Sequence, residues 1–281
     1  DKAVPVQSLD GRFPPERFFS LIGTNHRDYS MAKWAIGPMS DGLVQIKNAY
    51  VENSPRAFVH RSHSGHYGIV NSEEGYQNLR RFFFGNVRLD AFLDIQEITL
   101  PANVERKKKE GKKVHAPYHV EVIGRVRGAR WDLHRRTIDE ESAIFVDYDE
   151  HVRANKPVQL ASIFLTNRAR VTQQRASLGF SLDLRVQVPE YQVAGNWFGN
   201  DHYDGGFLYR DKINFEATWD KPKGWTLRYG FDTRTPNLTS ETADTEALAD
   251  GAYRFKVQVE QNTLPGIKAT LRIETRRWNQ A

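Results

Sequence analysis

The feature that most constrains the fold of this chain is a series of strand-like segments that fills residues 87–281. Apolar and polar side chains alternate along them, as at Phe255, Val257 and Val259, and this alternation is typical of strands with one buried face. About nine such segments follow one another, with "KPKG" and "LPG" as turns. We therefore predict two packed antiparallel sheets, an all-β antiparallel sandwich domain over residues 87–281.

Residues 1–86 show a different pattern, in which short apolar runs precede a helical segment. The runs "RFFSLIG" (17–23) and "AFVHR" (57–61) favour strands. The segment "NSEEGYQNLRRFFFG" (71–85) favours a helix, because Ser72 is a typical N-cap and Gly85 a typical end. The predicted order is strand, loop, strand, helix, with a domain boundary after residue 86.

Charge and composition exclude several classes of function. Of the net charge of +5, a local +4 lies in "ERKKKEGKK" (105–113), with six basic and two acidic residues. We interpret this run as a solvated loop and expect no nucleic-acid partner, although binding to phosphate or to an anionic membrane surface stays open. The absence of cysteine from the sequence excludes disulfides, thiolate metal sites and a cysteine nucleophile.

The sequence has no apolar run of the eighteen residues that a membrane-spanning helix needs. Its first residues, "DKAVPVQSLDGRFPPERFF", contain neither the apolar stretch of a signal peptide nor an initiating methionine. We expect a soluble chain that begins within a longer protein. The compartment is left open, with a secreted or periplasmic location favoured.

Histidines are concentrated in "HRSHSGHYGIV" (60–70), which holds three of the nine in the chain. This segment follows a predicted strand, where open α/β sheets place their reactive groups. Asp41 lies upstream in "SDGLV". Serine hydrolases with the triad order serine, acid, histidine place an acid and then a histidine in this sequence, so Asp41 and a histidine near residue 66 fit the last two positions.

The segments "SDGLVQIKNAYV" and "AFVHRSHSGHYGIVNSEEGYQNLRRFFFGN" resemble the C-terminal end of the catalytic domain of α/β-hydrolase-fold serine esterases and lipases, over about residues 15–86. The resemblance implies a C-terminal piece of an α/β-hydrolase sheet in residues 1–86. It implies Asp41 as the triad acid, His66 as the base, and a carboxylic ester or lipid as substrate. It implies neither a cofactor nor a metal ion.

The nucleophile is missing from this pattern. No G-x-S-x-G pentapeptide, the usual elbow for the catalytic serine, occurs in the 281 residues. We therefore expect an upstream segment or a partner chain to supply the serine. The alternative function is a non-catalytic β-sandwich binding module that carries a degenerate hydrolase remnant.

Other interpretations of the same residues stay open. His63 is the main rival of His66 as the base, Asp41 could be a simple turn former, and His60 with His63 and His66 could bind zinc. The loop "GNDHYDGGF" could bind calcium through two aspartates or be a plain hairpin, and its aromatic residues could contact lipid or carbohydrate or fill the sandwich core. These loop residues are Asp201, Asp204, Trp197, Phe198, Tyr203 and Phe207.

Overall fold

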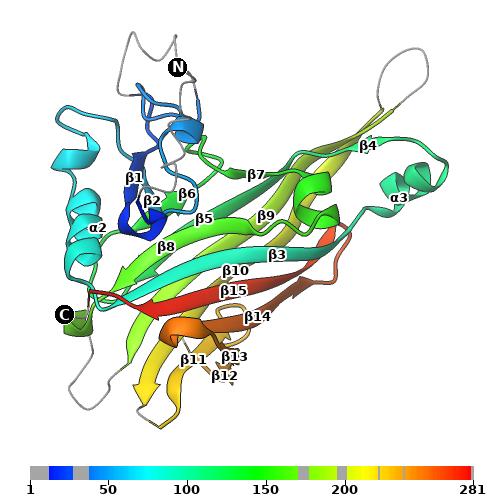
Figure 1. Cartoon of the computed structure of the whole chain (residues 1–281). Helices are drawn as coiled ribbons and strands as arrows, with labels where there is room; N and C mark the ends of the chain where they lie inside the picture. Colours follow the sequence, from blue (N-terminus) through cyan, green and yellow to red (C-terminus); the bar gives the residue numbers. More distant parts are fainter. Residues whose placement is uncertain are drawn as a thin grey trace.

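The computed structural model of the chain consists mostly of antiparallel β-strands (Figure 1). It describes residues 13–27, 38–169, 177–194, 201–220, 222–236 and 238–279. Two large sheets share most of these residues, and a pair of short parallel strands with one helix lies at one end of them (Figure 1).

The larger sheet has eight strands in the order β12-β11-β10-β9-β5-β6, with β4 paired to β9 and β7 paired to β5. All of its pairings are antiparallel. Its strands are β4 (Val114–His115), β5 (Tyr118–Val126), β6 (His134–Arg136), β7 (Ile144–Val146), β9 (Leu178–Val193), β10 (Asp201–Asp220), β11 (Gly224–Phe231) and β12 (Glu241–Thr242).

The smaller sheet has five strands in the order β13-β14-β15-β3-β8, again antiparallel throughout. Its strands are β3 (Val87–Thr99), β8 (Val158–Leu165), β13 (Asp244–Ala247), β14 (Tyr253–Gln261) and β15 (Gly266–Arg277). Strands β3 and β15 pair along their full length, from Val87 opposite Arg277 to Thr99 opposite Gly266. The centre of this sheet therefore joins two segments that are far apart in the sequence.

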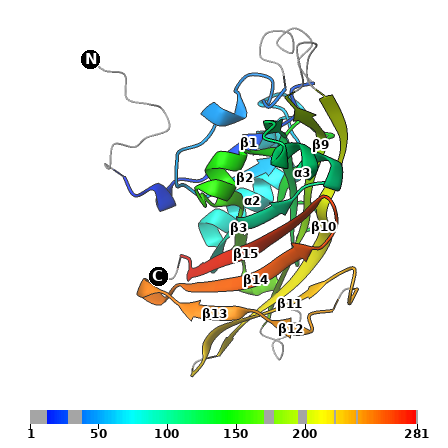
Figure 2. The same cartoon turned by 90° about the vertical axis from the view of Figure 1, so that its right-hand side faces the viewer.

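The two sheets share one apolar core. Alternate residues of β9, among them Leu182 and Leu184, are buried in the same cluster as Phe255, Val257 and Val259 of β14. This is the alternation that predicted strands, and removing these side chains from water is the main force that holds the sheets together. The arrangement is compatible with the predicted β-sandwich (Figure 2).

The N-terminal part contains strands β1 (Ser20–Gly23) and β2 (Arg56–Val59), which pair in parallel, and helix α2 (Glu73–Phe84). The helix begins and ends where the sequence predicted. Ser72 Oγ accepts a hydrogen bond from the Gly75 amide at 2.9 Å, and the Gly85 amide donates to the Arg81 carbonyl at 2.7 Å. A small apolar cluster of Ile22, Ile46 and Phe58 holds the strand pair.

The predicted fold class, a C-terminal piece of an α/β-hydrolase sheet joined to a sandwich, is wrong. In the described part of residues 1–86, two four-residue strands form the whole parallel sheet. An open α/β sheet needs several parallel strands with helices covering both faces. The described chain is a mostly β protein with two antiparallel sheets.

Helix α2 and the strand pair pack directly on the sandwich. The rings of Phe19, Phe82, Phe164 and Trp278 lie against one another, with Phe82 and Phe164 5.4 Å apart between centroids. Buried Asn78 of α2 donates its side-chain amide to the Leu133 carbonyl at 2.8 Å. These contacts fix the N-terminal elements to strands β6 and β8 and to the end of β15.

Regular structure is also found in the basic run, which was predicted as a loop, and in the segment before β14. Helix α3 (Ala102–Lys109) covers the first half of the basic run, and a Lys107–Glu110 ion pair at 3.1 Å supports its C-terminal end. Lysine, arginine and glutamate favour helices even on a fully solvated face, so high charge alone was a poor reason to predict a loop. The segment "TSETADTEALADG" (239–251) contributes the exposed edge strands β12 and β13.

Candidate active site

The candidate site begins at Asp41, in the loop between β1 and β2. One carboxylate oxygen, Oδ1, accepts hydrogen bonds from the backbone amides of Leu43 at 3.0 Å and Val44 at 2.8 Å. Aspartate favours such bonds to the amides that follow it, and Gly42 accepts the positive φ of 97° that the turn requires. The side chain is 5% exposed, so the loop holds a buried carboxylate in one orientation.

His63 occupies the other carboxylate oxygen. Its Nδ1 lies 2.8 Å from Asp41 Oδ2, and its backbone amide donates to the Asp41 carbonyl at 3.0 Å. Because an ionised carboxylate only accepts hydrogen bonds, we assign the imidazole proton to Nδ1, which leaves Nε2 as the basic nitrogen. No residue of the described chain hydrogen-bonds Nε2, and the side chain is 44% exposed. The Asp41–His63 pair is thus anchored on one side and accessible on the other.

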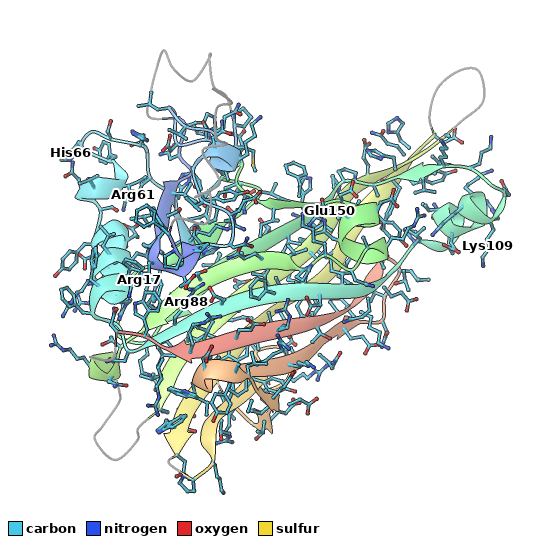
Figure 3. All side chains as sticks on the ribbon, in the orientation of Figure 1. Arg17, Arg61, His66, Arg88, Lys109 and Glu150 are labelled. Atoms are coloured by element: carbon cyan, nitrogen blue, oxygen red, sulfur yellow. The ribbon has the colours of Figure 1, made fainter. Side chains whose placement is uncertain are left out.

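The loop of residues 62–68, the histidine loop, turns His63 towards Asp41 and exposes His66 on its outer side. Gly65 has a φ of +84°, and the Gly68 amide closes the turn on the Gly65 carbonyl at 3.1 Å. Buried Ser62 donates its hydroxyl to the Ser64 carbonyl at 3.2 Å. His66 is exposed and packs edge-on against Tyr67, on the outer side of the loop (Figure 3).

The structure pairs Asp41 with a different histidine from the one predicted. The predicted partner of Asp41 was His66, but the structure brings Asp41 together with His63, the rival histidine. The reason is the positive-φ turn at Gly65, which reverses the chain immediately after His63 and carries His66 away from the carboxylate. Asp41 itself lies where an acid beside a histidine was expected.

Gly23, at the end of β1, supports the pair and was not recognised from the sequence. A methyl group at this position would lie 2.9 Å from the Asp41 Cβ and 2.4 Å from the Arg61 carbonyl oxygen. The absence of a side chain therefore lets β1 approach both loops of the site. No short motif around Gly23 signals this role, since it depends on residues that follow it by about 20 and 40 positions.

The other histidines near the site have separate partners. His60 Nδ1 lies 3.3 Å from Thr24 Oγ1 and 3.7 Å from Glu140 Oε2, and His26 Nε2 lies 3.1 Å from Glu141 Oε2. The three histidines of the zinc interpretation therefore do not converge. Across the described ranges, no group of three or more histidine, cysteine or acidic residues is arranged to hold a metal ion.

The hairpin-loop candidates are only partly described. Asp201 and Asp204 are exposed at the start of β10 and belong to no metal-binding group among the described residues. Tyr203 packs against the sandwich core, and Phe207 is exposed beneath the Arg210 guanidinium. Trp197 and Phe198 lie outside the described residues.

Comparisons of the chain with protein-family models, with curated proteins and with solved structures gave no significant match. Within the described ranges, no helix combines the length and the apolar character needed to cross a membrane.

Proposed function

We propose that the Asp41–His63 pair is the acid–base half of a serine hydrolase that acts on carboxylic esters. The observation that carries this proposal is the 2.8 Å contact between Asp41 Oδ2 and His63 Nδ1, with Nε2 exposed on the opposite side of the ring. Serine hydrolases use this arrangement because a hydroxyl is a poor nucleophile until an oriented imidazole removes its proton. The similarity of the two loop sequences to serine esterases supports the same chemistry.

In the proposed reaction, the serine Oγ attacks the ester carbonyl carbon while its proton moves to His63 Nε2. The negative Asp41 carboxylate stabilises the resulting imidazolium. As the tetrahedral intermediate collapses, Nε2 returns the proton to the departing alcohol and an acyl-enzyme remains. Water, deprotonated by the same nitrogen, then releases the acid and restores the serine.

The serine itself must come from a preceding segment or from a partner chain, because the 281 residues contain no nucleophile elbow. An apolar acyl group as substrate is supported by the two loops that carry the pair. Both expose large hydrophobic side chains: Leu43, after Asp41, is 45% exposed, and Tyr67 of the histidine loop is 63% exposed. Exposed side chains of this kind offer an apolar surface on which an acyl chain can pack.

The test uses the protein purified from its native source, with any accompanying chain, and measures fluorophosphonate labelling and hydrolysis of p-nitrophenyl octanoate. We expect His63→Gln to abolish labelling and Asp41→Asn to lower kcat by roughly 10⁴-fold, since an asparagine favours the wrong tautomer of the histidine. His66→Gln is the matched control, in the same loop and without contact to Asp41, and should retain activity.

Two results would overturn the proposal. Full activity in both His63→Gln and Asp41→Asn would remove the pair from catalysis. Absence of labelling and hydrolysis in the folded wild-type protein would favour the non-catalytic binding module instead.

A further inference from the structure

A cavity of about 230 Å³ lies beside the C-terminal half of α2. The N-cap of this helix, which is next to the histidine loop, lies at the opposite end. The cavity lies between α2, the turn that follows β5 and the residues that follow β8. Its polar lining is strongly basic, and none of the described residues that line it is acidic. The side chains that determine its chemistry are Gln77, Arg80, Arg81, Phe84, Thr166 and Arg168.

Arg81 is the most informative of these residues. It is 5% exposed, and its Nε has no hydrogen-bond partner among the described residues. No carboxylate of the described chain forms an ion pair with it; burial, and then the positive charge of Arg80, lower the pKa of Arg81. A buried guanidinium without a counter-charge is costly, because it loses hydration and gains no compensating attraction.

Two other arginines of the chain, Arg88 and Arg61, have acidic partners. Buried Arg88 lies 2.8 Å from Asp90, and Arg61 lies 2.9 Å from Glu74 near the other end of α2. In the cavity, by contrast, Arg80 and Arg168 add two further positive charges around Arg81. The fold thus concentrates three guanidinium groups where none has an acidic partner within the described residues.

The wall opposite the helix is shaped by Gly128. Its φ is +81°, and a methyl group at this position would lie 2.8 Å from the Ala169 Cβ. Both residues line the cavity. A side chain at position 128 would push Ala169 and its neighbour Arg168 out of place, so the glycine preserves the positions of the basic groups.

We propose that this cavity binds the phosphate group of a small phosphomonoester. Planar guanidinium groups donate paired hydrogen bonds that match the oxygens of phosphate, and an anion here supplies the counter-charge that Arg81 lacks. The exposed ring of Phe84 lines the same cavity and offers an apolar surface to the organic part of the ligand. The site is independent of the Asp41–His63 pair.

The binding test uses thermal unfolding and titration calorimetry of the native protein with three probes: inorganic phosphate, phenyl phosphate and benzoate, at about 0.15 M salt to screen non-specific attraction. We expect phenyl phosphate to bind more tightly than inorganic phosphate, and benzoate at least tenfold more weakly than phenyl phosphate. Binding of benzoate with equal affinity would overturn the assignment to phosphate, and absence of binding by both phosphates would overturn the site.

Variants locate the binding. Arg81→Met should abolish binding and, because it removes an uncompensated buried charge, should raise the Tm of the unliganded protein. Arg168 is exposed, so the Arg168→Gln variant should fold normally. It should weaken phenyl phosphate binding by tenfold or more. The matched control is Arg210→Gln, which replaces an exposed arginine on β10 and should leave binding unchanged. Equal binding by Arg168→Gln and the control would contradict the proposal.

Discussion

Replacing Gly23 by alanine tests whether the close approach of β1 positions the Asp41–His63 pair. The added methyl group would lie 2.4 Å from the Arg61 carbonyl oxygen, 2.9 Å from the Asp41 Cβ and 3.0 Å from the Ile69 Cδ1, where ordinary contacts are 3.4–4 Å. The Arg61 carbonyl cannot rotate away freely, because it accepts the Asn25 amide at 3.1 Å.

Relief of these contacts therefore requires the backbone of β1 or of the histidine loop to move. Overpacking of this kind costs about 1–3 kcal/mol, so we expect the free energy of unfolding to fall by that amount. Since the methyl group also presses on Asp41, the hydrogen bond to His63 Nδ1 should lengthen. Urea unfolding measures the first effect, and the proton resonance of the His63 Nδ1–H in NMR spectra measures the second.

The matched control is Gly206→Ala on β10. A methyl group there would lie 3.6 Å from the nearest atom, Pro265 Cγ, which is an ordinary contact. We expect its stability to stay within about 0.5 kcal/mol of wild type. Equal stability of Gly23→Ala and Gly206→Ala, together with an unchanged His63 resonance, would show that Gly23 does not position the pair.

Two further predictions concern the core. Burial, and then the positive charges of Arg136 and Arg56, lower the pKa of His134 from 6.5 to about 3. As the pH falls, this histidine is therefore protonated in the unfolded chain at a higher pH than in the folded protein. Stability should therefore fall as pH drops from about 6.5 towards 3, by up to about 1.4 kcal/mol per pH unit, and His134→Phe should flatten this dependence in urea titrations; an unaltered slope would contradict it. Trp278→Ala should lower the free energy of unfolding by about 1–3 kcal/mol, because the half-buried ring packs on Phe82 and Phe164; urea unfolding measures this loss, and a loss under about 0.5 kcal/mol would show that the C-terminal residues do not secure α2.

Most long strands could be predicted from the sequence because one buried face imposes strict alternation. The segments "YHVEVIGRV" and "YRFKVQVEQ" coincide with β5 and β14. The strands that were missed, β4, β6, β12 and β13, have two to four residues each. Alternation cannot be recognised over so few positions, and these strands exist because a neighbouring strand offers hydrogen bonds to them.

The fold class was harder to predict, because local patterns do not state how many strands a sheet contains. The runs around residues 20 and 58 do form adjacent parallel strands. A larger parallel sheet was predicted because the loop sequences after these strands resemble those of α/β hydrolases. All other strands of the described chain pair in antiparallel fashion.

At the site, the residue types were predictable and their pairing was not. Asp41 follows from "SDG", and the histidine from its loop. The choice between His63 and His66 depends on one positive-φ turn at Gly65 and on the contact of Gly23 with the aspartate loop. The spacing of the aspartate and the histidines along the sequence reveals neither the turn at Gly65 nor the close approach of Gly23.

The pairing of β3 with β15 has a consequence for how the chain reaches its folded state. The first and last long strands are neighbours, and the helix before β3 is tied to the residues after β15 through the bond from Trp278 Nε1 to the Phe82 carbonyl. Such distant pairing is slow to form, because a large loop must close first. On the ribosome, the edge of β3 that pairs with β15 must wait until residues 266–277 have been synthesised, so it needs protection from aggregation while the intervening residues are made.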